Sequence, residues 1–299
     1  MARQLTPLML LLWLPFFANA LPEVRIGVLK YGTVNWEVDV IKHHGLDKKY
    51  KFDLNVMALA SKNAAAVALQ SQAVEIILSD WLWVTRQRFN HKNYTIYPTS
   101  HATGGLYVAA DSGIDSIRAL KGRKIGIAGG AVDKNWLLLQ AYSKLKFNLD
   151  IAKISQPTFT SPPLLNRLMF RGDLSAAINF WHYGARLDAG GFKLLVTVPE
   201  MLTALGIKTK LPLLGWVFSQ DWAAQNPQLI KGFLKASQEA KEILYRSDTE
   251  WQRISHLTKA ETPEVLARLK SHYRAGLLRQ FAQPEITAAA QIFSILAQQ

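Results

Sequence analysis

Short runs of hydrophobic residues recur along the chain, and segments with helical periodicity separate most of them. The runs are rich in β-branched residues and end at polar or glycine-containing turns, a pattern typical of buried strands. Strands that alternate with helices predict an α/β fold with mainly parallel sheets and right-handed crossovers. The predicted strands are Val24–Lys30, Phe52–Ala58, Val74–Leu78, Thr95–Pro98, Leu106–Ala110, Lys124–Ala128, Lys153–Pro157, Leu174–Phe180, Lys193–Val198 and Leu213–Ser219.

The pattern changes after the last predicted strand, because only helical segments follow it. Asn226 and Pro227 start an amphipathic helix that runs through Tyr245. Further helices are predicted over Thr249–His256, Pro263–Gly276 and Pro284–Ala297.

One strand–turn–helix unit in the middle of the chain gathers several polar groups at its turn. Gly129 and Gly130 follow the strand, and Asp133 and Asn135 precede the next helix. Free backbone N–H groups collect at such a helix start and can hold the polar end of a ligand. In a similar turn near the amino end, Asn35 is predicted to cap the helix that follows.

The first 20 residues have the features of a secretory signal peptide. Arg3 gives a basic start, Leu8–Phe17 an apolar core, and Ala18-Asn19-Ala20 a small-residue cleavage site. The apolar core is too short for a helix that spans a membrane. We therefore expect cleavage after Ala20 and an exported mature chain, with an uncleaved anchor as the alternative.

The 299-residue chain contains no cysteine, which excludes disulfides, thiolate metal sites and cysteine nucleophiles. Its formal net charge is +13, but the basic residues are scattered and form no dense stripe with interleaved aromatic residues. We therefore expect no nucleic-acid partner. The charge is compatible with solubility, attraction of an anionic solute or contact with an anionic surface.

Ligands of open α/β sheets bind beyond the carboxyl ends of the strands, and six of the nine tryptophans lie in these predicted turns. Their rings suit a planar ligand by stacking or a cation by cation–π attraction. The alternative is that these tryptophans pack as ordinary core. The predicted ligand-binding residues are Tyr31, Asn35, Trp36, Ser79, Asp80, Trp81, Gly129, Gly130, Asp133, Asn135, Trp136, Asn179, Trp181, His182 and Trp216.

The charged and glycine residues of this set leave the sign of the ligand's charge open. Asp80 and Asp133 could pair with a cation, or each could cap the helix that follows it. Gly129 and Gly130 could donate backbone N–H groups to an anion, which is compatible with a tight turn. The sequence has no catalytic motif and no metal-ligand spacing, so we expect no catalytic residue, metal or cofactor.

Four segments carry a family pattern. The most specific, Ile117–Gly130 (IRALKGRKIGIAGG), is similar to an L-K-G-K-K-I-A-V-x-x-G segment, and the others are Ala64–Ser79, Leu168–Phe180 and Phe218–Phe233. In this order they resemble the periplasmic solute-binding proteins of ABC importers. The branch is the one that includes binders of taurine, aliphatic sulfonates, nitrate and thiamine precursors.

The resemblance implies a two-lobed type II periplasmic binding fold, in which each lobe is a mainly parallel sheet flanked by helices and extra C-terminal helices lie on lobe one. Lobe one would comprise residues 21–104 and 211–299, and lobe two residues 105–210. It further implies a monomeric periplasmic protein that captures a small organic solute in an aromatic-lined cleft by hinge closure. Its partners would be that solute and an inner-membrane ABC permease.

Two other functions stay open. Some thiamine-precursor relatives of this fold do chemistry on a bound cofactor, and an enzyme of that kind would use Lys134 or His182 here. A non-transport accessory protein would instead dock a periplasmic partner through the cleft or a basic surface.

Overall fold

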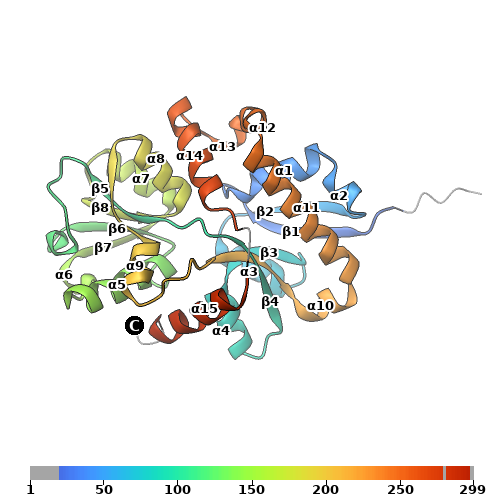
Figure 1. Cartoon of the computed structure of the whole chain (residues 1–299), viewed down its shortest axis with the longest axis horizontal. Helices are drawn as coiled ribbons and strands as arrows, with labels where there is room; N and C mark the ends of the chain where they lie inside the picture. The colour runs from blue at the N-terminus through green and yellow to red at the C-terminus, as the bar shows by residue number, and fades with distance from the viewer. Residues whose placement is uncertain (1–19, 279–280, 297–299) are drawn as a thin grey trace, which may run out of the picture.

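The computed structural model describes residues 20–278 and 281–296 and arranges them in two lobes, each built on a five-stranded sheet (Figure 1). The predicted signal peptide, apart from Ala20, lies outside the described residues. All ten predicted strands are present. One is displaced, because Ile151–Ile154 forms the short helix α6 and the strand β7 begins only at Gln156.

The sheet of lobe one has the order β2-β1-β3-β10-β4. β1 runs parallel to β2 and β3, whereas β10 runs antiparallel to both of its neighbours, β3 and β4. Its strands are β1 (Glu23–Leu29), β2 (Asp53–Leu59), β3 (Ile76–Asp80), β4 (Tyr94–Ser100) and β10 (Leu214–Ser219). Its helices are α1 (Val34–His43), α2 (Leu46–Lys49), α3 (Lys62–Gln70), α4 (Trp81–Phe89), α10 (Gln220–Gln225) and α11 (Pro227–Arg246).

The sheet of lobe two repeats this plan in the order β7-β6-β8-β5-β9, and again one strand, β5, is antiparallel to both neighbours. Both sheets are therefore mixed, with one reversed strand each. The strands are β5 (Gly105–Ala109), β6 (Lys124–Ala128), β7 (Gln156–Thr160), β8 (Ala176–Asn179) and β9 (Phe192–Thr197). The helices are α5 (Lys134–Phe147), α6, α7 (Pro162–Phe170), α8 (Trp181–Ala189) and α9 (Val198–Ala204), with a 3₁₀ turn over Ile117–Leu120.

The first connection between the lobes touches the segment that follows helix α14 (Pro263–Ala275). Residues 101–104 lead from β4 to β5, and the backbone N–H of His101 donates to the carbonyl of Gly276, with 2.7 Å between N and O. Ser100 and Leu277 form an isolated antiparallel bridge beside it. A Cβ at Gly276 would lie 2.5 Å from the Cβ of Ala102, so only glycine allows this approach. The two segments thus form one narrow joint.

The C-terminal helices do not all lie on lobe one (Figure 1). The long helix α11 packs on α1, but α14 packs against α8 of lobe two and α15 against α5. Ala288 and Ile292 of α15 belong to the same buried cluster as Leu138 and Leu139 of lobe two. The end of the chain therefore ties the lobes together. These helices are α12 (Asp248–Arg253), α13 (Ser255–Thr258), α14 (Pro263–Ala275) and α15 (Gln283–Leu296).

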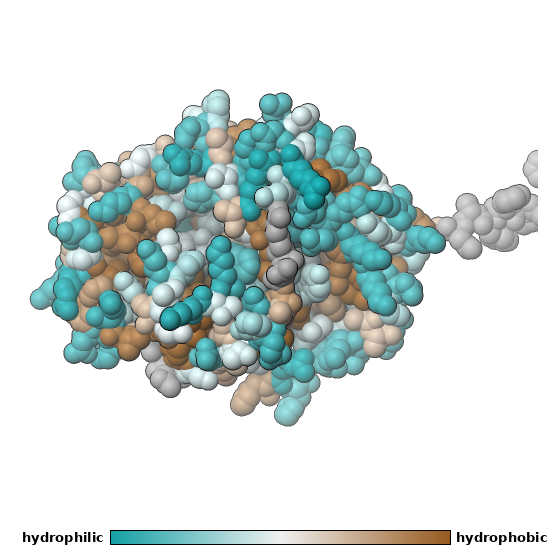
Figure 2. Space-filling model, viewed as in Figure 1, coloured by the Kyte–Doolittle hydropathy of each residue, from teal (hydrophilic) through white to brown (hydrophobic). Residues whose placement is uncertain are grey.

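The face in Figure 2 is mainly hydrophilic and carries separate hydrophobic patches. Within the described ranges, no helix is both long enough and apolar enough to cross a bilayer.

Candidate functional site

Two adjoining cavities lie between the lobes. The inner cavity, of about 100 Å³, is bounded by the end of β3 on one side and by the starts of α5 and α8 on the other. The outer cavity, of about 670 Å³, opens beside it, and Lys62, Phe180 and His182 line both. Charged and polar residues at the inner cavity are Lys62, Ser79, Asp80, Lys134, Asn135 and His182. The two cavities are the best candidate for a ligand site, because concave clefts between domains are the usual place for one.

Lobe one contributes the starts of two helices to the cleft. Asp80 ends β3 and caps α4, since its Oδ1 accepts a hydrogen bond from the backbone N–H of Trp83 at 2.9 Å. Ser61 caps α3 in the same way, by accepting from the backbone N–H of Ala64 at 3.1 Å. Lys62 is the first residue of α3 and projects into the cleft from this position.

Lobe two contributes the glycine turn and the start of α5. Gly129 and Gly130 have φ angles of +88° and +91°, a region that favours glycine. The buried Asp133 caps α5 by accepting from the backbone N–H of Asn135 at 3.0 Å. Asp133 therefore has the capping role that the sequence left as an alternative to ligand binding. The glycines line the outer cavity, and the first two residues of α5, Lys134 and Asn135, line the inner one.

Lys62 reaches across the cleft to lobe two. Its Nζ lies 3.4 Å from Oδ2 of Asp133 and 5.0 Å from the centre of the Phe180 ring. The positive charge of Lys134, followed by burial, lowers the pKa of Lys62, although Asp133 and Asp80 act in the opposite direction. The side chain as a whole is 41% exposed, so the burial concerns its ammonium end in the cleft. Two lysine and two aspartate side chains therefore interact in the cleft, and the repulsion between the lysines is the largest single effect on the pKa of Lys62.

Lys134 is the most unusual of these groups. Only 8% of the residue is exposed, and within residues 20–278 and 281–296 its side chain has neither a hydrogen bond nor an ion pair. Oδ1 of Asn135 and Nδ1 of His182 are buried without a hydrogen-bond partner as well. Buried polar groups in proteins are nearly always paired, because an unpaired one loses its hydration without compensation. Asn135 and His182 therefore each have one buried, unpaired atom at the inner cavity, which the side chain of Lys134 also lines.

His182 adds no positive charge to this site. Burial, and then the charge of Arg186, lowers the pKa of His182 from 6.5 to about 3. The imidazole is therefore neutral over the whole physiological range, and the lysines are the cations that face the inner cavity.

Three of the predicted ligand-binding tryptophans are core residues, which corrects their interpretation. Trp36 is 3% exposed and packs edge-on against Trp251, with 5.4 Å between ring centres. Trp136 is equally buried and packs against Phe159. Trp216 is 1% exposed and lies in the middle of the reversed strand β10, so its side chain points into the lobe and not out of a strand end.

The other two predicted tryptophans differ from each other. Trp181, at 8% exposure, lines the inner cavity and packs edge-on against Trp36, with ring centres 5.9 Å apart. Trp81 lines neither of the two cleft cavities. It packs against the core of lobe two, and its buried Nε1 has no hydrogen-bond partner.

Two asparagines of the predicted set serve the backbone. Asn35 does not cap α1, because the helix already begins at Val34. Its Nδ2 instead donates to the carbonyls of Leu29, at 2.9 Å, and Gly32, at 2.7 Å. Asn179 is fully buried, and its Nδ2 donates to Oδ1 of Asn166 at 2.9 Å. Both fix the shape of turns beside the cleft. Tyr31, at 72% exposure, lies at the outer cavity.

Sequence reasoning missed Lys62 and Phe180, and it considered Lys134 only as a catalytic residue. A signal for the lysines exists in the sequence. Both follow a capping residue directly and so occupy the first position of a helix, where the helix dipole disfavours a cation. A lysine placed there against local preference points to an anion nearby.

The model of one protein family matches residues 96–250, and its description is NMT1/THI5 like. A search of curated proteins finds no significant match. Among solved structures, the alkanesulfonate-binding protein SsuA from Xanthomonas axonopodis pv. citri bound to MOPS is 14% identical with a TM-score of 0.70, and the match covers 94% of each chain. The periplasmic aliphatic sulphonate binding protein SsuA from Escherichia coli is 22% identical with a TM-score of 0.70, over 92% of this chain and 90% of that one.

An enzyme has the same fold. The desulfurization enzyme DSZB is 12% identical with a TM-score of 0.62, over 93% of this chain and 92% of that one. The fold of the chain is thus that of two-lobed periplasmic binding proteins.

Proposed function

The chain belongs to the NMT1/THI5-like family, and from this premise we propose that it is an exported binding protein that captures a small organic anion between its two lobes. It would act in the periplasm after removal of the segment that ends at Ala20, and deliver its solute to an ABC permease of the inner membrane. The shared fold with periplasmic sulfonate-binding proteins supports this role. We expect it to act as a monomer.

The observation that carries the choice of an anion is the unpartnered, buried Lys134 opposite Lys62. Each lysine starts a helix, so the positive ends of two helix dipoles add to the two ammonium charges. A bound anion would relieve the repulsion between these charges. Asp133 is paired with Lys62 and caps α5, and Asp80 caps α4 through its Oδ1.

Two parts of the solute would occupy the two cavities. Its anionic group would lie in the inner cavity between Lys62 and Lys134. The rings of Trp181 and Phe180 offer an apolar wall. The rest of the solute would extend into the outer cavity, which is larger and more open to solvent.

Lobe closure would provide the mechanism of capture. The solute contacts α3 from lobe one and α5 from lobe two, so it stabilises the arrangement in which the two helix starts face each other. Closure also removes water, which strengthens the attraction between the lysines and the anion. A permease can then distinguish the loaded protein by its closed shape.

A thermal-shift screen tests this proposal. Sulfonates, aromatic acids, amines and pyrimidines would be compared on the mature protein, and a true ligand at one hundred times its Kd would add about 2.7 kcal/mol of stability. We expect stabilisation by anions only. Lys134→Gln should weaken binding of the best anion by about tenfold or more, since it removes a charge-assisted interaction in a buried site.

Lys231→Gln is the matched control, because Lys231 is an exposed lysine on α11 outside both cavities. It should leave the affinity unchanged. Stabilisation by amines in place of anions, or equal affinity of Lys134→Gln and the wild type, would contradict the proposal.

An enzyme on the same scaffold is the second candidate, and the fold shared with DSZB is the observation in its favour. His182 would be a poor general base, because its pKa of about 3 makes it too weak to take a proton at neutral pH. Lys134 would then have to carry the chemistry. If the wild-type protein converts a bound anion into a product and the Lys134→Gln variant does not, the result would favour the enzyme hypothesis.

A further inference from the structure

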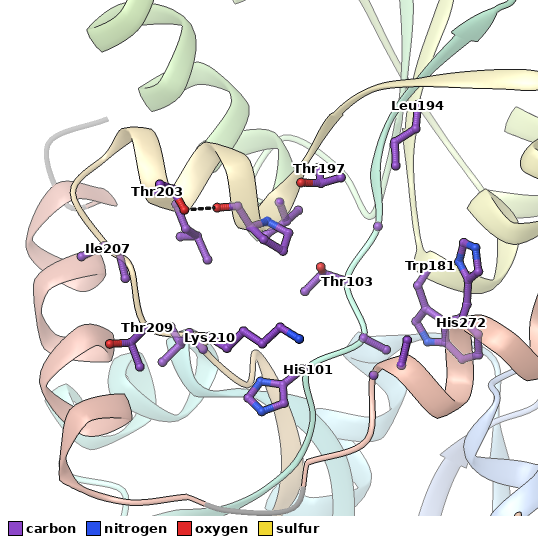
Figure 3. Close-up of a pocket in the computed structure, with 18 of the residues that line it drawn as sticks. His101, Thr103, Trp181, Leu194, Thr197, Thr203, Ile207, Thr209, Lys210 and His272 are labelled. Atoms are coloured by element: carbon purple, nitrogen blue, oxygen red, sulfur yellow. Dashed lines mark hydrogen bonds between the residues drawn. The ribbon is translucent and has the colours of Figure 1, made fainter. Parts of the chain in front are cut away.

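A third cavity, of about 310 Å³, shares part of its lining with the inner cavity. Figure 3 shows the residues around it. We call it the hinge pocket. Its walls are residues 101–104 and 207–211, which connect the lobes, together with parts of β9 and α9 and the end of α14. Ala102, Thr103, Gly104 and Trp181 line both the hinge pocket and the inner cavity. A thin partition of backbone and one indole ring therefore separates the two.

The charged groups of the hinge pocket have one sign. Lys208 and Lys210 line it, and no Asp or Glu occurs among its described lining residues. Figure 3 shows the side chain of Lys210 reaching across the pocket beside His101. Nδ1 of His101 is buried and has no hydrogen-bond partner. The exposed ammonium group of Lys210 is therefore the charged group that the pocket offers to a ligand.

Opposite these polar groups the wall is apolar. Leu194 of β9, Val198 and Leu202 of α9, and Ile207 face the same space. Leu194 is 41% exposed and offers most of this apolar surface, whereas Val198 is fully buried and Leu202 and Ile207 are 4% exposed each. Such a wall suits the hydrocarbon part of a ligand. The combination of cationic and apolar walls selects an amphiphilic anion.

We propose that the hinge pocket is a second ligand site, which binds a small organic carboxylate with an apolar body and thereby controls lobe closure. This goes beyond capture of a solute in the cleft. The carboxylate pairs with Lys210, and the apolar body lies against Leu194, Leu202 and Ile207.

The hinge pocket can control lobe closure because two of its walls are the segments that connect the lobes. Residues 101–104 and 207–211 must change their backbone angles when the lobes move, so the pocket changes shape with closure. A ligand that fits one shape better shifts the balance between open and closed forms. The coupling is reciprocal. If the ligand of the hinge pocket changes the affinity of the cleft for its solute by some factor, the solute changes the affinity of the hinge pocket for its ligand by the same factor.

Calorimetric titration with 4-bromobenzoate and with hexanoate tests the site on the mature protein. We expect one binding event for each probe, weakened by about tenfold or more in Lys210→Gln, which loses the charged partner of the carboxylate. Lys210 is exposed, so this variant folds normally. The exposed Lys231→Gln on α11 is the matched control and should bind like the wild type.

A second variant separates this proposal from the cleft proposal. Lys134→Gln removes a cation from the inner cavity, so binding of 4-bromobenzoate should persist in it if the hinge pocket is the site. Binding lost in Lys134→Gln and retained in Lys210→Gln would overturn the hinge pocket and leave the cleft proposal standing.

Anomalous diffraction from a crystal soaked with 4-bromobenzoate gives the position directly. A bromine peak beside Leu202 and Ile207 is the expected result. A peak only in the cleft, or no bromine peak and no heat of binding, would overturn the proposal.

Discussion

At the scale of single residues, the cleft is defined by two lysines in places that local structure disfavours. Lys62 and Lys134 each occupy the first position of a helix, next to the positive end of its dipole, and they also repel each other. A protein keeps such an arrangement when function offsets its cost. The tryptophans that dominated the sequence interpretation contribute much less, because most of them fill the core.

The lowered pKa of Lys62 predicts how binding depends on pH. The anion binds the protonated lysine, so affinity is full below the pKa of Lys62 and falls as pH rises through it. Because the charge of Lys134 lowers this pKa below the ordinary 10.5, the fall begins at a lower pH than for an ordinary lysine. The slope can reach about tenfold per pH unit.

Calorimetric affinities of the best anion between pH 7 and 10 would measure this effect. In Lys134→Met, the pKa of Lys62 should return toward its ordinary value, and the decline should move to higher pH. An unchanged pH profile in that variant would show that the two lysines do not interact.

Substitutions of two tryptophans should separate an effect on ligand binding from an effect on core packing. Trp216 is 1% exposed, and its Nε1 donates to Oγ of Ser237 at 2.9 Å, so Trp216→Leu should lower the free energy of unfolding by about 3 kcal/mol and leave the affinity unchanged. Trp181 lines the inner cavity, so Trp181→Leu should weaken ligand binding as well. Urea unfolding and ligand titration on both variants would check this contrast. Equal effects on affinity would contradict it.

At the scale of elements, the glycine turn before α5 shows what the sequence predicts and what it leaves out. The strand Lys124–Ala128 has the predicted bounds, and a positive φ at Gly129 and Gly130 agrees with the expected tight turn. Local pattern determines these features. The buried location of Trp216 depends instead on the place of β10 in the sheet of lobe one, where it is a reversed strand between β3 and β4. The periodicity of a single strand does not indicate which strands it will pair with.

The cavities could not be predicted from the sequence either, because residues far apart in the chain form them. Lys62 and Asp133 are far apart in sequence, and the ion pair between them exists only because the two lobes face each other. Their residue types are unremarkable in isolation. The position of each lysine at the start of a helix was the one local indication of a ligand site. This indication becomes useful only when both helix starts are known to line the same cavity.

The two glycines of the turn have different surroundings, which makes them a matched pair. A Cβ at Gly129 would lie 2.4 Å from Oδ2 of Asp133, whereas a Cβ at Gly130 would have no atom within 4 Å. Gly130→Ala should therefore cost only backbone strain, about 1 kcal/mol. Gly129→Ala should cost at least about 1 kcal/mol more, because it displaces the cap of α5.

Urea unfolding of both variants would give the difference. Gly129→Ala should also move the start of α5, and with it Lys134. Equal loss of stability in the two variants would rule out a special role for the contact with Asp133.

At the scale of the whole molecule, Arg186 is a tie between the lobes on the side of α14. It belongs to α8 of lobe two, and its guanidinium donates to the carbonyl of Thr258 at 2.6 Å and lies 3.4 Å from Glu261. The side chain is only 13% exposed. These bonds hold lobe two against the helices that pack on lobe one.

Arg186→Gln should therefore shift the balance of lobe arrangements toward more open forms. We expect a larger radius of gyration by small-angle X-ray scattering without added solute, and weaker solute binding because closure becomes less favourable. Arg171→Gln is the control, since Arg171 is 72% exposed and pairs only with the nearby Asp173. An unchanged radius of gyration in Arg186→Gln would show that Arg186 does not hold the lobes together.

The position of β10 also fixes the order in which the lobes can be completed during synthesis. β3 and β4 do not pair with each other, and each pairs with β10. Lobe two is contiguous from β5 to β9 and has all of its strands before β10 has been made. The sheet of lobe one, although it begins first, cannot close until the ribosome has added Ser219. Until then, the edges of β3 and β4 that pair with β10 have no partner strand in this sheet.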